Sequence, residues 1–269
     1  MIVIVSIVFA LAAAWLLLLM PRRNHPGWEK LAGYRYAHRG LHNAEKGVPE
    51  NSMTAFRLAV EHGLGAELDV HLLADGNLAV FHDKTLKRVC GADVEIEDLT
   101  AEQLKNYSLL GTEEHIPLFE EVLELFEGKT PLIVELKMER GNTAALTDAV
   151  MQRLADWQGN YCVECFHPAV VRYLKQEYPH VIRGQLSENF LGGKTLSGFA
   201  AFLMTFLLST AFTRPDFIAY RWKDRKNISL RLMKALYGVH EVSWTVEDAE
   251  TMKRLEADGC AVIFEKFIP

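Results

Sequence analysis

The chain has 269 residues, of which 49% are hydrophobic and 24% are charged, and its 29 basic and 35 acidic side chains give a net charge of −6. This length allows one large domain or two small ones, with a sizeable core. A nucleic-acid-binding protein is excluded because binding to phosphate backbones needs a concentrated basic surface, and the sequence has no long run of Lys or Arg.

The first predicted element is an apolar helix over residues 1–20, in which Ser6 is the only polar side chain. At ~1.5 Å per residue this helix reaches about 30 Å, the thickness of the hydrocarbon core of a bilayer. We predict an uncleaved transmembrane anchor rather than a signal peptide, since no basic segment precedes it and no small-residue cleavage site follows. Arg22 and Arg23 flank its C-terminal end, which predicts a single-pass protein of the cell membrane with a cytoplasmic body.

Residues 21–32 are predicted to be a connector, and from residue 33 onward short β-rich runs alternate with helical patterns. This alternation is typical of βα units, so we predict one α/β domain over residues 33–269, a (β/α)₈ TIM barrel. Only residues 72–77 separate the second strand from the third, and residues 83–131 form a long insertion. Nine strands are predicted for eight barrel positions, at residues 34–38, 66–71, 78–82, 132–137, 161–165, 181–185, 216–220, 240–245 and 261–264.

A second apolar stretch lies within residues 190–213 and includes Phe199, Phe202, Phe206 and Phe212. Three interpretations remain open for it: a buried helix, an interfacial helix that faces lipid or a lipid-like substrate, and a second membrane span.

Reactive side chains cluster at the ends of the predicted strands. In a TIM barrel the catalytic groups lie at the carboxyl ends of the strands. These ends carry His38 and Arg39 on the first strand, Glu67 and Asp69 on the second, His82 and Asp83 on the third, and Glu135 and Lys137 on the fourth. We therefore predict that they meet at one mouth of the barrel.

Three of these side chains, Glu67, Asp69 and Glu135, are candidate metal ligands. Glu135 follows a buried apolar run, where an unpaired carboxylate would cost several kcal/mol. Three hard oxygen ligands at one mouth fit one divalent cation, Mg²⁺ or Ca²⁺. The alternative is that Glu135 and Lys137 form a structural ion pair while the other two carboxylates bind loop amides.

The basic side chains predict phosphodiester cleavage. This reaction needs one group that removes a proton from the nucleophile and another that protonates the leaving alkoxide, and His38 and His82 can fill these roles. Arg39 and Lys137 can stabilise the charge on the phosphate oxygens.

Eight short motifs between Tyr34 and Thr245 point to a known family. They are His38-Arg39-Gly40, Pro49-Glu50-Asn51-Ser52, Glu67-Leu68-Asp69-Val70, Phe81-His82-Asp83, Ile116-Pro117, Glu120-Glu121-Val122-Leu123, Glu135-Leu136-Lys137 and Trp244-Thr245. With these motifs the sequence resembles the glycerophosphodiester phosphodiesterase family. The resemblance implies a TIM barrel of the phospholipase-C-like type that uses a divalent metal to hydrolyse glycerophosphodiesters to sn-glycerol 3-phosphate and an alcohol.

The resemblance also implies roles for individual residues. His38 and His82 become the acid/base pair, with a metal-ligand role as the alternative for His82. Glu50 and Asn51 belong to an element that orders the site, and Trp244 either lines the glycerol pocket or is a core aromatic.

The chain departs from the family pattern in its second half. Glu247 follows Trp244-Thr245-Val246 where the family usually has Asn, Cys165 replaces a common Ser, and the closing strand lacks the usual aspartates. These departures put the identity of the substrate in doubt more than the activity.

Three functions are consistent with the sequence. The first is an enzyme at the inner membrane face that acts on deacylated phospholipids or lysophospholipids, with the lipid bilayer as its partner. The second is the same enzyme facing outward and cleaving glycerophosphate polymers at the cell surface. The third is an inactive module that binds lipid headgroups.

Overall fold

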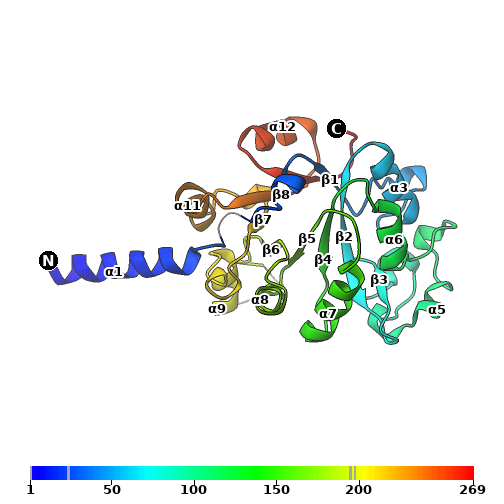
Figure 1. Cartoon of the computed structure of the whole chain (residues 1–269), viewed down its shortest axis with the longest axis horizontal. Helices are drawn as coiled ribbons and strands as arrows, with labels where there is room; N and C mark the ends of the chain where they lie inside the picture. The colour runs from blue at the N-terminus through cyan, green and yellow to red at the C-terminus, as the bar shows by residue number, and fades with distance from the viewer. Residues whose placement is uncertain (1, 23–24, 194–195, 197) are drawn as a thin grey trace.

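The computed structural model describes residues 2–22, 25–193, 196 and 198–269. Its centre is a closed barrel of parallel strands in the order β1-β9-β8-β7-β6-β5-β4-β2, in which β1 pairs again with β2 (Figure 1). This arrangement confirms the predicted TIM barrel. The barrel strands are β1 (Arg35–His38), β2 (Gly65–Leu72), β4 (Leu132–Leu136), β5 (Tyr161–Cys165), β6 (Arg183–Ser187), β7 (Phe217–Arg221), β8 (His240–Val246) and β9 (Ala261–Phe264).

The third predicted strand, at residues 78–82, lies outside the barrel. β3 (Leu78–Val80) pairs antiparallel with the end of β2 through a short turn, which explains why nine strands were predicted for eight positions. Because β3 leaves the barrel, β4 lies directly beside β2, and Asp69 is the register partner of Glu135. Glu135 is in turn the register partner of Glu164 on β5. The topology thus places acidic residues side by side on three neighbouring strands.

Helices cover the outside of the barrel and complete its core. Each longer helix buries one apolar face, and the rings of Phe56 and Phe126 meet edge to face at 6.1 Å. The covering helices are α3 (Met53–Glu61), α6 (Phe119–Phe126), α7 (Thr143–Leu154), α8 (Pro168–Glu177), α11 (Ile228–Tyr237) and α12 (Ala249–Ala257).

The predicted insertion, residues 83–131, has a small core of its own. It includes α4 (Lys87–Cys90) and α5 (Ala101–Leu104), and its apolar side chains, among them Val89 and Ile96, pack against Phe81. The insertion therefore forms a folded lobe beside the mouth of the barrel.

The predicted connector is packed against the amino-terminal end of the barrel. α2 (Glu29–Ala32) follows Trp28, whose ring stacks on His240 with centroids 4.5 Å apart. Arg22 pairs with Asp216 and donates a hydrogen bond to the carbonyl of Val181 at 3.0 Å. Arg23, the second residue on which the membrane orientation was predicted, lies outside the described residues.

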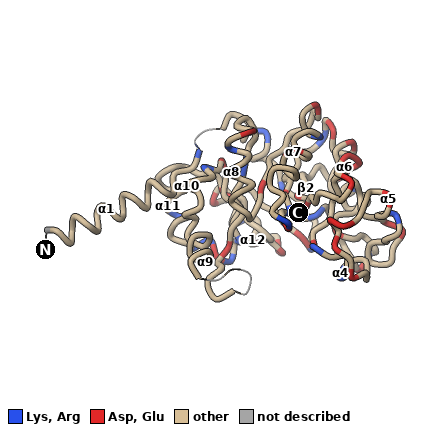
Figure 2. The backbone as a smooth tube through the Cα atoms, turned by 90° about the horizontal axis from the view of Figure 1, so that it is seen from below, with Lys and Arg blue, Asp and Glu red and all other residues tan. Residues whose placement is uncertain are grey.

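α1 (Ile2–Leu19) projects away from the barrel (Figure 1), and Figure 2 shows no charged residue along it. Its apolar side chains are largely exposed, as in Phe9 at 74%. Its last turn is bound to the barrel, because Arg214 donates to the carbonyl of Leu17 at 3.0 Å and Thr210 to that of Leu18 at 3.0 Å. Leu19 is completely buried.

Within the described residues, no helix is long and apolar enough to cross a membrane. The transmembrane span predicted over residues 1–20 is therefore not supported. With its 18 residues α1 is about 27 Å long, and its last turn is hydrogen-bonded to Thr210 and Arg214.

The second apolar stretch forms two short helices, α9 (Gly198–Thr205) and α10 (Thr210–Thr213). Of the three interpretations of this stretch, a second membrane span is not supported, because the 8 residues of α9 extend only about 12 Å. α9 buries Ala201 and Met204 and exposes Phe199 and Phe202, so it lies on the surface with one face covered. Residues 194–195 and 197 of this stretch are outside the described part.

Candidate active site

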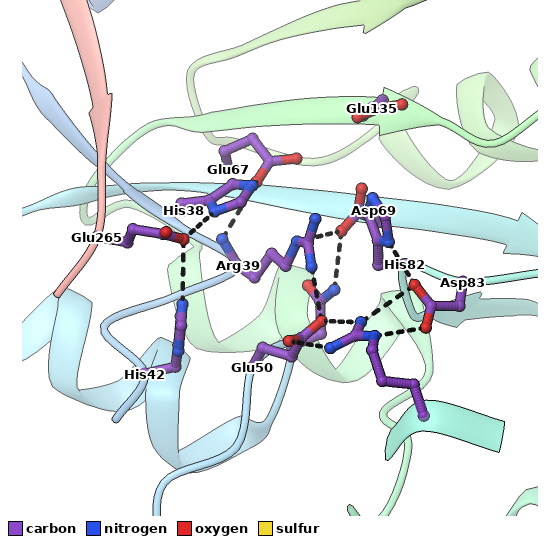
Figure 3. A network of polar contacts seen from close by, with 12 residues as sticks. His38, Arg39, His42, Glu50, Glu67, Asp69, His82, Asp83, Glu135 and Glu265 are labelled. Carbon is purple, nitrogen blue, oxygen red and sulfur yellow. Dashed lines mark hydrogen bonds and ion pairs between the residues drawn. The ribbon is translucent and has the colours of Figure 1, made fainter. Parts of the chain in front are cut away.

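The predicted site residues meet at one mouth of the barrel (Figure 3). A cavity of about 130 Å³ lies at this mouth, and the residues that line it are His38, Arg39, Glu67, His82, Glu135, Glu164, Phe166, Leu186, Trp244, Thr245 and Ile263. His38 ends β1 and is the register partner of Glu67. Asp69 lies farther along β2, and Lys137 directly follows β4.

Glu67, Asp69 and Glu135 form a buried acidic triad whose oxygens lie within 4.8 Å of one another. Burial, reinforced by Asp69 and Glu135, raises the pKa of Glu67 well above its usual range. Burial also raises the pKa of Glu135, against the effect of Lys137. Burial acts in the same direction on Asp69, but Lys137 and Arg39 outweigh it and hold the pKa of Asp69 below its usual value. Such a concentration of carboxylate oxygens fits a divalent cation.

Two basic side chains bind this triad directly. The Nζ atom of Lys137 lies 2.8 Å from Oδ1 of Asp69 and 2.7 Å from Oε1 of Glu135. The Nε atom of Arg39 lies 3.4 Å from Oδ2 of Asp69, and its backbone N–H donates to Oε2 of Glu67 at 3.1 Å. The ion pair between Glu135 and Lys137 that the sequence suggested is therefore present. Contact of Arg39 and Lys137 with a substrate phosphate stays a prediction.

Glu50 and Asn51 support the site from the loop after β1. Asn51 donates from Nδ2 to Oδ2 of Asp69 at 2.9 Å, and its backbone N–H donates to the carbonyl of Arg39 at 2.9 Å. Glu50 accepts from Arg39 at 2.7 Å and from Arg88 at 2.7 Å. Burial alone would raise the pKa of Glu50, but Arg88 and Arg39 lower it to about 2. These two residues therefore position Arg39 and Asp69.

His38 is held by a carboxylate that the sequence analysis missed. Its Nδ1 atom lies 2.7 Å from Oε2 of Glu265, while its Nε2 atom lies 4.0 Å from Oε2 of Glu67. His42 points to Glu265 from the other side at 3.8 Å (Figure 3). Burial lowers the pKa of His38 even though Glu265 opposes the shift. Glu265 directly follows the last predicted strand. A search for reactive side chains at the ends of all predicted strands would therefore have identified it.

His82 reaches the site from a loop and not from a barrel strand. β3 ends at Val80 and is antiparallel, which corrects the prediction that His82 ends a barrel strand. The Nδ1 atom of His82 lies 2.6 Å from Oδ1 of Asp83, and Arg88 in α4 binds the same carboxylate at 2.7 Å. Burial lowers the pKa of His82 to about 4. Arg88 thus joins the insertion to the site, and no spacing in the sequence identified it.

Gly40 has two features that exclude other residues. Its φ angle is +78°, and a Cβ atom would lie 2.8 Å from the backbone carbon of Ala55. Gly40→Ala is expected to lower the free energy of unfolding by about 2–4 kcal/mol, since backbone strain and overlap add. Gly47→Ala is the matched control, because its φ of +72° gives the strain but nothing lies within 4 Å. Equal losses in urea unfolding of the two variants would contradict the predicted overlap.

Known proteins resemble this chain in sequence and in fold. A glycerophosphodiester phosphodiesterase of Bacillus altitudinis is 32% identical over 158 residues, which are 54% of this chain and 63% of that relative. A human lysophospholipase D is 36% identical over 102 residues, 33% of this chain and 32% of the relative. The solved structure of an Oleispira antarctica phosphodiesterase in complex with the product sn-glycerol-3-phosphate shares the fold, with a TM-score of 0.69, 22% identity and coverage of 86% of this chain and 92% of the other.

The match to a family extends over nearly the whole barrel. The model of the glycerophosphoryl diester phosphodiesterase family matches residues 38–268, which begin at His38 on β1 and continue past β9. The part of the Bacillus relative that aligns with this chain is less than two thirds of that relative's length. The residues matched by the family model include the whole acidic triad and both histidines. This chain belongs to the glycerophosphoryl diester phosphodiesterase family.

Proposed function

We propose that this chain hydrolyses glycerophosphodiesters to sn-glycerol 3-phosphate and an alcohol. The observation that carries the proposal is the pairing of two histidines with carboxylates at the edges of one buried acidic triad. His38 is bound through Nδ1 to Glu265, and His82 is bound through Nδ1 to Asp83. Each histidine therefore keeps its Nε2 atom for a proton of the substrate.

The two histidines and Arg39 have different roles in the proposed reaction. With Nδ1–H donated to a carboxylate, a neutral imidazole accepts a proton at Nε2, and the same imidazole in its charged form donates one there. One of the two histidines acts as the base toward the attacking hydroxyl or water, and the other protonates the leaving alkoxide. Arg39, held in place by Glu50, contacts the non-bridging oxygens of the phosphate.

The acidic triad is the proposed binding site for one Mg²⁺ or Ca²⁺ ion. Glu67, Asp69 and Glu135 would hold it, and the fit rests on three buried carboxylates whose oxygens lie within 4.8 Å of one another. When bound, such an ion stabilises negative charge on the phosphate and favours deprotonation of the nucleophile. Lys137 neutralises part of the triad's charge through Asp69 and Glu135.

A lysophospholipid is the second candidate substrate, and a lipid bilayer is the proposed partner. The exposed apolar side chains on α1, with Phe9 among them, favour both, as do Phe199 on α9 and Phe212 on α10. Burying these side chains in lipid would remove their apolar surface from water. Placement of the barrel on the cytoplasmic side remains our proposal from the sequence, and the outward orientation is the alternative.

The test is release of sn-glycerol 3-phosphate from glycerophosphocholine by the full chain. We expect turnover that EDTA abolishes and that added Mg²⁺ or Ca²⁺ restores. Lysophosphatidylcholine in phosphatidylcholine vesicles is assayed in parallel, for release of the corresponding lysophosphatidic acid. Folded protein that turns over neither substrate with either ion would leave the headgroup-binding module as the function.

A further inference from the structure

Glu164 is a fourth buried carboxylate at the mouth of the barrel, and none of the roles above uses it. It lies on β5 beside Glu135, is 1% exposed and lines the cavity of about 130 Å³. Its Oε2 atom is buried without a hydrogen-bond partner among the described residues. An unpaired carboxyl group in such surroundings is strongly unfavourable, so a partner that binds in the cavity is expected.

The acidic triad does not account for Glu164. The three residues whose oxygens lie within 4.8 Å of one another are Glu67, Asp69 and Glu135. The nearby cation, Lys137, is bound to two of them. Glu164 lines the same cavity but does not belong to this group.

Four apolar or aromatic side chains line the cavity together with the polar site residues. Phe166, Leu186, Trp244 and Ile263 line it, and the rings of Phe166 and Trp244 are fixed edge to face at 5.6 Å and 89°. The Nε1 atom of Trp244 is also buried without a partner among the described residues. One acceptor and one donor in the lining of this cavity thus lack partners among the described residues.

From these contacts we infer that Glu164 and Trp244 bind the two free hydroxyl groups of the substrate's glycerol, which makes Glu164 a specificity-determining residue. The inference rests on the proposed function. The two oxygens of a carboxyl group match two hydroxyls on adjacent carbons, and the indole N–H donates to one of them. The carbon atoms of the glycerol pack against the rings of Phe166 and Trp244.

The inference favours deacylated glycerophosphodiesters over lysophospholipids. An acyl chain on one hydroxyl removes a hydrogen-bond donor and leaves Glu164 partly unpaired.

The experiment compares two substrates on the full chain. One is glycerophosphocholine. The other is the phosphocholine ester of propane-1,2-diol, which keeps the hydroxyl next to the phosphorylated carbon and lacks the terminal one. We expect the wild type to prefer glycerophosphocholine by about 100-fold or more in kcat/KM, because sites built around a hydroxyl reject analogues that lack it. Glu164→Ala is expected to reduce this preference to about tenfold or less, because turnover of glycerophosphocholine falls by a larger factor than turnover of the analogue.

Two further variants separate recognition from structure. Glu164→Gln retains an acceptor oxygen and is expected to lie between wild type and alanine in preference. Trp244→Phe removes the N–H group but keeps an aromatic ring, and is expected to reduce the preference by a smaller factor. Equal losses on both substrates in Glu164→Ala would overturn the inference, since a structural role affects both alike.

Separate controls test whether Glu164 binds the metal ion and whether the subsite exists without turnover. Stabilisation of Glu164→Ala by Mg²⁺ or Ca²⁺ in thermal unfolding should match the wild type, and a clear loss would make Glu164 a cation ligand and overturn the inference. If the wild type turns over neither diester, the proposed function fails. Thermal shifts with sn-glycerol 3-phosphate and with propane-1,2-diol 1-phosphate then test the subsite alone, and equal shifts would overturn it.

Discussion

Replacing His38 with alanine is expected to lower kcat on glycerophosphocholine by about 10²–10⁴-fold, the contribution of a well-placed acid or base. The expectation rests on its Nδ1 contact with Glu265 and on its Nε2 atom, which faces the acidic triad 4.0 Å from Glu67. The measurement is initial-rate release of sn-glycerol 3-phosphate at saturating substrate.

His42 provides the control for this prediction. It also points to Glu265, at 3.8 Å, but it does not line the cavity. His42→Ala is therefore expected to retain activity within about tenfold of the wild type. If both variants lost activity to the same extent, the assignment of His38 as a catalytic residue would be contradicted.

Asp69→Asn is expected to abolish measurable turnover and to lower the free energy of unfolding by about 3–5 kcal/mol. Asp69 is 1% exposed and compensates the buried Lys137 and the partly buried Arg39, which lie 2.8 Å and 3.4 Å from its oxygens. The amide keeps the volume of the side chain but loses the charge. It also turns an N–H group toward Asn51, which donates to the carboxylate at 2.9 Å.

Urea unfolding and the glycerol 3-phosphate assay measure the two effects. Asp75→Asn is the control, because Asp75 is an exposed turn residue that accepts hydrogen bonds from backbone N–H groups of the loop. We expect this control to change stability by less than about 1 kcal/mol and to leave turnover unchanged. An Asp69→Asn variant that is as stable and active as the control would exclude the proposed role of the triad.

The barrel could be predicted because its signals are local. Short apolar runs alternate with helical patterns along the whole chain, and acidic or basic residues stand at their ends. The extra strand at residues 78–80 was ambiguous, since only pairing shows that it folds back on β2. The triad could be predicted for the same reason, because Glu67, Asp69 and Glu135 each lie within a predicted strand.

The missed features depend on contacts between distant parts of the chain. Glu265 meets His38 only because β9 closes the barrel against β1. Arg88 reaches Glu50 and Asp83 only once the insertion has folded. α1 has the composition of an anchor, but its binding to Thr210 and Arg214, nearly 200 residues away, cannot be deduced from local hydropathy.

The pairing of the first barrel strand with the last has a consequence for synthesis of the protein. His38 is among the first barrel residues to leave the ribosome, and its partner Glu265 follows the last strand. A nascent chain therefore carries the triad and both histidines long before the contact between His38 and Glu265 can form. The proposed hydrolysis would thus begin only after the whole barrel has been translated.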